Sequence, residues 1–250
     1  MSGHSKWSTI KRKKGAADAK RGQQFSKLAR MITVAVKEGG PDPEMNFKLR
    51  LAIDKAKEAN MPSVNIERAI SGASKEGFAI EEITYEAYGP EGIALLIRAV
   101  TDNRNRASSE IKAVLAKHNG SLGSPGSVSY LFKQKGLAAI DAKNLGEDKK
   151  DELELLAIDL GAEDIKEEGD LIEIYTMPKN LHKVSAGLKE KGFKIESENL
   201  EMNPENSIEV EAENKAKKIL NLVDALEELE DVEEVFSNFD IADEIMEKIS

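Results

Sequence analysis

The hydrophobic pattern of this 250-residue chain changes its period near residue 80, and this change restricts the fold more than any other feature. Residues 18–75 carry apolar side chains at three- and four-residue steps, such as Phe25, Leu28 and Ile32, which predicts helices with one apolar face. Gly39-Gly40-Pro41 and Asn60-Met61-Pro62 interrupt this pattern. We therefore expect residues 1–79 to form a basic arm followed by a three-helix bundle.

Beyond Phe78 the alternation becomes strand-like. It predicts strands over 83–88, 93–101 and 127–132, with a helix between the last two. Residues 136–202 then follow the order βαββαβ, which is typical of a ferredoxin-like domain. The helix over 212–230 and the strand over 232–239 have no partners after them. We expect an α+β multidomain fold with two ferredoxin-like domains, in which 135–204 are inserted into a domain built from 80–134 and 205–250. Two sequential domains are the alternative.

The charge of the chain is strongly divided between its two ends. Residues 4–30 contain nine Lys or Arg and one acid, a charge of +8, whereas the whole chain carries −10, so the rest carries −18. Such a division predicts a directed contact with a polyanion at the N-terminus. Trp7 lies inside the basic run and is suited to stacking on a base. A solvated, flexible N-terminus is the plain alternative. The candidate nucleic-acid-binding residues are Lys6, Trp7, Lys11, Arg12, Lys13, Lys14, Lys20, Arg21, Lys27 and Arg30.

A second polar group precedes a predicted helix at Asp102-Asn103-Arg104-Asn105-Arg106. Arginine and asparagine side chains can contact phosphates and base edges. Capping of the helix by Asp102 or Asn103 is an equally good interpretation, and both can hold together. The possible secondary contact residues are therefore Asn103, Arg104, Asn105 and Arg106.

Several classes of chemistry find no support in the sequence. The chain has no cysteine, its three histidines show no metal-ligand spacing, and no nucleophile elbow is present. Gly120–Ser127 is glycine-rich, but it leaves a helix and opens a strand, unlike a phosphate-binding loop, so we interpret it as a connector. We expect no catalytic residue, no metal and no cofactor. An enzyme with a carboxylate site between the α+β domains remains the third hypothesis.

No apolar run in the sequence approaches the roughly 20 residues that a membrane helix needs. The basic N-terminus could be compared with a mitochondrial transit peptide, but it continues directly into an apolar helical pattern. We therefore expect a cytoplasmic protein that makes no membrane contact.

Several motifs follow one another along the whole chain. In order, they are Ser2-Gly3-His4-Ser5-Lys6-Trp7, Lys20-Arg21, Asn60-Met61-Pro62, Asn65-Ile66, Arg68-Ala69-Ile70, Tyr88-Gly89-Pro90, the run from Thr101 to Arg106, and Asn238-Phe239-Asp240. Together these motifs resemble the YebC/PmpR family, although Gln23-Gln24 stands where a further basic residue is common. The resemblance implies a cytoplasmic, non-enzymatic regulator with three domains; relatives are described as DNA-binding transcriptional regulators or, including mitochondrial members, as translation factors.

Two hypotheses follow for the function. In the first, the chain is a DNA-binding transcriptional regulator whose arm contacts the duplex backbone and whose acidic domains contact a protein partner. In the second, it is a ribosome-associated translation factor whose arm contacts rRNA or mRNA. A single basic arm without heptads suits an RNA crevice, whereas the family resemblance favours transcription. The sequence does not indicate an oligomeric state.

Overall fold

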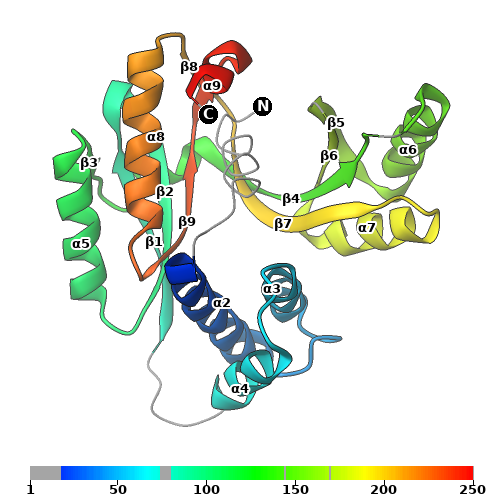
Figure 1. The fold of residues 1–250 in the computed structure, drawn as a ribbon, viewed down its shortest axis with the longest axis horizontal. Helices are drawn as coiled ribbons and strands as arrows, with labels where there is room; N and C mark the ends of the chain where they lie inside the picture. The colour runs from blue at the N-terminus through cyan, green and yellow to red at the C-terminus, as the bar shows by residue number, and fades with distance from the viewer. Residues whose placement is uncertain (1–17, 74–79, 144, 169, 250) are drawn as a thin grey trace. The chain divides into compact units, whose positions relative to one another are not determined.

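The computed structural model describes residues 18–73, 80–143, 145–168 and 170–249 (Figure 1). By their internal contacts these residues form two compact units. One unit is Phe132–Glu205, and the other is built from the chain on either side of it. The helical N-terminal region and the first sheet therefore share one unit, and the Phe132–Glu205 segment is an insertion in the sequence of that unit.

Three helices open the described chain: α2 (Asp18–Gly39), α3 (Phe47–Glu58) and α4 (Ser63–Ala73). Their apolar faces meet in one core, as the sequence predicts, with Ile32, Leu49 and Ile66 among its buried members. The second helix begins at Phe47, directly after its N-cap Asn46. The buried side chain of Asn46 fixes this start, because it accepts the Leu49 N–H at 3.0 Å and donates to the Ala35 carbonyl at 2.6 Å.

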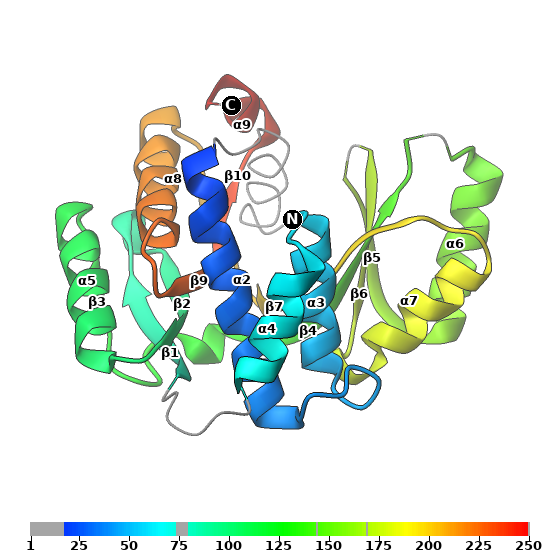
Figure 2. The same cartoon turned by 60° about the horizontal axis from the view of Figure 1, so that its bottom comes forward.

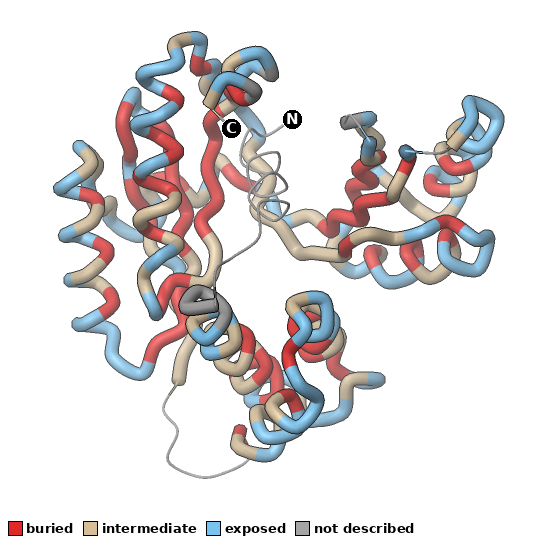
Figure 3. The backbone as a smooth tube through the Cα atoms, in the orientation of Figure 1, coloured by how far each residue is buried: buried red, intermediate tan, exposed pale blue. Residues whose placement is uncertain are grey.

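The first sheet has four antiparallel strands in the order β3-β1-β2-β9. Two helices, α5 and α8, cover one face, and Ile97, Ile111 and Leu222 are fully buried between the layers (Figures 1 and 3). The elements of this domain are β1 (Glu81–Tyr88), β2 (Ala94–Thr101), α5 (Arg104–Lys117), β3 (Ser121–Leu122), β8 (Ile208–Val210), α8 (Glu213–Glu227), β9 (Val232–Ser237), β10 (Phe239–Ile241) and α9 (Asp243–Ile249).

The predicted strand over 127–132 is wrong for most of its length. Ser129–Leu131 form a short 3₁₀ helix, and the strand β4 begins only at Phe132. The reason is the buried carboxylate of Glu86, which accepts the backbone N–H groups of Gly126, Val128 and Ser129 at 2.6–2.8 Å. Amides that point at one carboxylate cannot also alternate along a strand ladder.

The inserted unit contains the expected βαββαβ order. Its strands pair antiparallel in the order β5-β6-β4-β7, as in a ferredoxin-like sheet. Leu153 of α6, Ile174 of β6 and Leu188 of α7 are fully buried, so the unit has a core of its own. Its elements are β4 (Phe132–Asp141), α6 (Glu147–Leu160), β5 (Ala162–Glu168), β6 (Leu171–Thr176), α7 (Leu181–Glu190) and β7 (Ile195–Pro204). The α+β class predicted from the sequence is confirmed.

Candidate nucleic-acid interface

The predicted nucleic-acid-binding residues fall into three groups in the structure. Lys27 and Arg30 have described side chains on α2. Lys20 and Arg21 lie in the first turn of α2, where the structure describes the backbone only. The remaining candidates, Lys6, Trp7, Lys11, Arg12, Lys13 and Lys14, lie outside the described residues.

The side chain of Lys27 contacts the protein itself. Its Nζ donates to the carbonyl oxygens of Glu227 at 2.5 Å and Val232 at 2.7 Å, and Gln23, one turn earlier, donates to the Glu228 carbonyl at 2.6 Å. Glu227 is the last residue of α8, where carbonyl groups lack helical partners and the helix dipole favours a cation. This face of α2 therefore caps α8, and Figure 2 shows α2 running beside α8 and β9.

Arg30 belongs to a buried polar centre around Asp231. The Asp231 side chain is only 2% exposed, and Arg30 Nη1 lies 3.1 Å from its Oδ1. Arg106 Nη2 donates to the same carboxylate at 2.9 Å, and the Thr101 hydroxyl does so at 2.9 Å. The hydrogen bonds that Arg106 donates to Asp231 and Asp102 raise the pKa of Arg106 above its usual value. Asp231 thus joins α2, the end of β2 and the start of α5.

The group from Asn103 to Arg106 caps and anchors α5. Asn103 is the N-cap, and its Oδ1 accepts the N–H groups of Asn105 and Arg106 at 3.1 Å, which confirms the capping interpretation. Arg104 pairs with Glu81, with Nη2 at 2.7 Å from Oε2. Residues 104–106 are all exposed, and Arg106 is in addition held by Asp231. A contact of this group with nucleic acid stays a prediction.

Acidic residues of the first sheet also pair with cations of α3. Lys55 Nζ lies 2.6 Å from Glu234 of β9, and Lys48 Nζ lies 2.7 Å from Glu82 of β1. Among the described side chains of α2, α3 and α4, the cations that make no ion pair or hydrogen bond are Lys37 and Arg68. Half of the described cations of the helical region, Lys27, Arg30, Lys48 and Lys55, therefore bind groups of the sheet domain.

The carboxyl group of Glu233, on β9 beside Glu234, has a raised pKa. The register of β9 against β2 shifts at Arg98/Ala99, and this bulge places the side chains of both Glu233 and Glu234 near Arg98. Burial raises the pKa of Glu233 to about 8, although the charge of Arg98 opposes the rise. Glu233 is consequently protonated over much of the neutral range.

Two of these features were not predicted from the sequence. Asp231 and Glu86 lie in acid-rich segments where nothing distinguishes them in the sequence. Only the fold shows that each carboxylate accepts several hydrogen bonds. The residues that the structure describes contain no cluster of His, Cys, Asp or Glu with the geometry of a metal site. Within that part of the chain, no helix combines the length and the apolar character needed to cross a bilayer.

Known proteins resemble this chain over its full length. A "Probable transcriptional regulatory protein" of Rubrobacter xylanophilus is 51% identical over 253 residues, and one of Halothermothrix orenii is 52% identical over 252 residues; each alignment covers all of this chain and at least 99% of the relative. These relatives are named as regulators, not as enzymes.

A crystal structure of a conserved hypothetical protein from Aquifex aeolicus has a TM-score of 0.82 and 46% identity, covering 92% of this chain and 94% of the other. Residues 5–76 match the model of the TACO1/YebC protein N-terminal domain, and residues 80–239 match that of the TACO1/YebC second and third domain. Because the two matches follow each other along nearly all of its length, the chain belongs to the TACO1/YebC family.

Proposed function

We propose that this protein is a DNA-binding transcriptional regulator that contacts the DNA backbone with the basic residues between Lys6 and Arg21. One observation carries the proposal: residues 4–21 hold seven Lys or Arg and one acid, a charge of +6, in a chain of charge −10. Phosphate contacts by such a segment supply affinity without reading sequence. The names of the relatives agree with a role in transcription.

The contacts of Lys27 and Arg30 indicate that these two residues support the fold and do not bind DNA in this proposal. Both side chains are engaged by carbonyl and carboxylate groups of the second domain. We therefore assign them the task of fixing α2 against α8 and β9, in the same helix whose first turn contains Lys20 and Arg21. The acidic remainder of the chain repels phosphates and confines binding to the N-terminus.

Fluorescence anisotropy with a labelled DNA duplex tests this proposal. Replacing Lys11, Arg12, Lys13 and Lys14 by Ala should remove up to four phosphate contacts and reduce the slope of log K against log salt by about 3 to 4. A matched control replaces four exposed lysines elsewhere, Lys117, Lys183, Lys191 and Lys218, and should leave the slope unchanged. Equal effects of the two quadruple variants would show that only net charge matters and would refute a directed arm.

RNA is the second candidate, favoured by the position of Trp7 within the basic run. An indole can stack on an unpaired base but finds no such partner along a fully paired duplex. Trp7→Ala should therefore weaken binding to a structured RNA more than binding to duplex DNA. Equal losses with both ligands would remove the argument for RNA. Sedimentation of a cell lysate, with nuclease controls, would separate the two roles: migration with ribosomes supports translation and association with the nucleoid supports transcription.

A further inference from the structure

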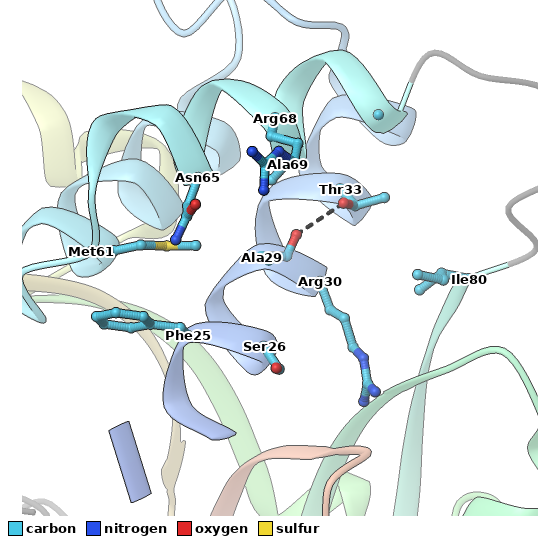
Figure 4. A pocket seen from close by; sticks show the side chains of 11 residues that line it. Phe25, Ser26, Ala29, Arg30, Thr33, Met61, Asn65, Arg68, Ala69 and Ile80 are labelled. Carbon is cyan, nitrogen blue, oxygen red and sulfur yellow. Dashed lines mark hydrogen bonds between the residues drawn. The ribbon is translucent and has the colours of Figure 1, made fainter. Parts of the chain in front are cut away.

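A cleft lies between α2 and α4, close to the end of the basic segment. Its volume is about 490 Å³, within the range of ligand sites in proteins. Its walls are mainly apolar and include Phe25 and Ala29 of α2, Met61, Ala69 of α4 and Ile80 (Figure 4). Phe25 is only partly buried, so one part of an aromatic ring faces the cleft. Residues 74–79, between Ala73 and Ile80, lie outside the described residues.

Two polar side chains in this cleft have no partner among the described residues. Asn65 and Arg68 lie three residues apart on α4 and both line the cleft, and neither side chain makes a hydrogen bond or ion pair with a described residue. The other polar groups are satisfied: Thr33 donates to the Ala29 carbonyl at 2.9 Å, and Arg30 is bound to Asp231. An amide and a guanidinium that bind no described group and lie beside an apolar wall suit a planar, polar ligand.

We propose that this cleft binds one unpaired nucleotide of the nucleic acid that the basic segment holds. The base packs against Phe25 and Met61, the Asn65 amide hydrogen-bonds the base edge, and Arg68 pairs with the adjacent phosphate. Asparagine and arginine are side chains that recognise base edges and phosphates, and aromatic rings stack on bases of any sequence. The proposal rests on the proposed function, because it assigns a specific contact to a strand that the arm has already captured.

The position of the cleft supports this occupant. In the sequence Lys14 lies four residues before Asp18, where the described part of α2 begins, and Phe25 lies seven residues after Asp18, which is about 10 Å along a helix. Lys20 and Arg21 lie between the two points. We expect a strand bound to these cations to reach the mouth of the cleft, where the exposed Arg68 adds a positive charge. Unpaired bases occur in both DNA and RNA, so the ligand class is shared by the two candidate functions.

The test compares a hairpin carrying a single-nucleotide bulge with the same hairpin fully paired, each made in DNA and in RNA, with the full chain. We expect the bulged form to bind about tenfold more tightly, the gain typical of one base stack. Asn65→Ala, Arg68→Ala and Phe25→Leu should each reduce this preference, while affinity for the paired hairpin stays within about twofold because the stack is absent there. Lys37→Ala removes an exposed cation of α2 that pairs with no described residue, and it is the matched control for Arg68→Ala. It should leave the preference intact.

A photo-crosslink adds a readout that does not depend on affinity. A 4-thio-substituted base at the bulge should crosslink to peptides containing Phe25 or Met61. Equal affinity for bulged and paired hairpins, or crosslinks confined to residues 4–21, would overturn the cleft proposal while leaving the arm proposal standing. If the unmodified chain bound neither hairpin, the proposed function itself would fail. Circular dichroism of each variant confirms that any lost preference is not a loss of folding.

Discussion

The two compact units differ in how far apart along the chain the partners of an ion pair can lie. In the unit that contains α2, Arg30 and Asp231 are 201 residues apart, and Lys55 and Glu234 are 179 apart. In the inserted unit, Lys150 and Glu167 are 17 apart, and Lys189 and Glu198 are 9 apart. The pairs of Arg30 and Lys55 join elements from opposite ends of the chain, whereas those of Lys150 and Lys189 join elements that are close in sequence.

This difference shows that part of the basic N-terminal sequence serves the fold. Exposed local pairs contribute at most about 1 kcal/mol, because water screens them and side-chain entropy opposes them. A buried carboxylate shared by several donors is different, since removing it leaves charges and hydrogen-bond donors without partners. The long-range pairs should therefore dominate the electrostatic contribution to stability, and the following predictions test that contrast.

The largest effect is expected for Asp231→Ala. Arg30, Arg106 and the Thr101 hydroxyl would lose their common acceptor, and the free energy of unfolding should fall by about 3 kcal/mol. This value is at the low end for a buried pair because the half-exposed Arg106 can turn to solvent. Urea denaturation measures the change. A loss below about 0.5 kcal/mol, the size typical of a surface substitution, would show that the centre is not a structural one.

Glu233 should make the free energy of unfolding depend on pH. Its pKa is raised to about 8 by burial, so between the ordinary carboxyl pKa and 8 the folded state binds more protons than the unfolded state. Stability must therefore fall as pH rises through this window, by up to about 1.4 kcal/mol per pH unit. The groups that act on Glu233 are Arg98 and Lys55, which favour its ionisation, and Glu234 and Glu82, which oppose it.

Glu233→Gln isolates this contribution. The amide keeps the shape and cannot ionise, so the variant should lose less stability than the unmodified chain between pH 6 and pH 8. Thermal unfolding at a series of pH values measures the difference. Parallel pH profiles for the two proteins would mean that Glu233 ionises normally. Glu196→Gln, at a half-buried carboxylate of the inserted unit that pairs with the exposed Lys194, is the control and should change little.

Glu86→Ala should produce a smaller and more local effect. Three backbone N–H groups would lose their acceptor, and we expect about 2 kcal/mol of destabilisation, since the partly exposed Gly126 and Ser129 can bind water instead. Burial opposes ionisation of Glu86, but these hydrogen bonds outweigh it and lower its pKa. Hydrogen exchange over residues 121–131 should accelerate while exchange in the inserted unit is unchanged. Unaltered exchange at Val128 would contradict the assignment.

The sequence predicts the elements of this fold well where a period is sustained. The helices with Phe25, Leu28 and Ile32, and the βαββαβ order of the inserted unit, follow from apolar spacing alone. It fails where a single side chain decides the local structure. Glu86 converts an expected strand at Ser127–Leu131 into a 3₁₀ turn, and its partners lie about 40 residues away. The short strands β3, β8 and β10 are too brief to leave a periodic signal.

For the candidate interface, the sequence predicts the positive charge but not which cations are available to a ligand. Counting Lys and Arg identifies the basic segment, but it cannot separate the cations that face solvent from those that hold the protein together. Lys27 and Arg30 belong to the second group because the C-terminal end of α8 and Asp231 approach α2 from 200 residues further along the chain. The cleft could not be predicted from the sequence either, because Asn65 and Arg68 line it only where α4 packs against α2.

The smallest effect separates two lysines that each pair with one glutamate. Lys189→Ala removes a pair between neighbouring elements in which the lysine is 55% exposed, and it should change the unfolding free energy by at most about 0.5 kcal/mol. Lys55→Ala removes a pair in which both side chains are only about a quarter exposed, and it should cost about 1 kcal/mol. Raising the salt to about 1 M, where the Debye length is near 3 Å, should abolish the first loss and retain part of the second. Equal losses that vanish together with salt would mean that the sequence distance between partners has no bearing on what an ion pair contributes in this protein.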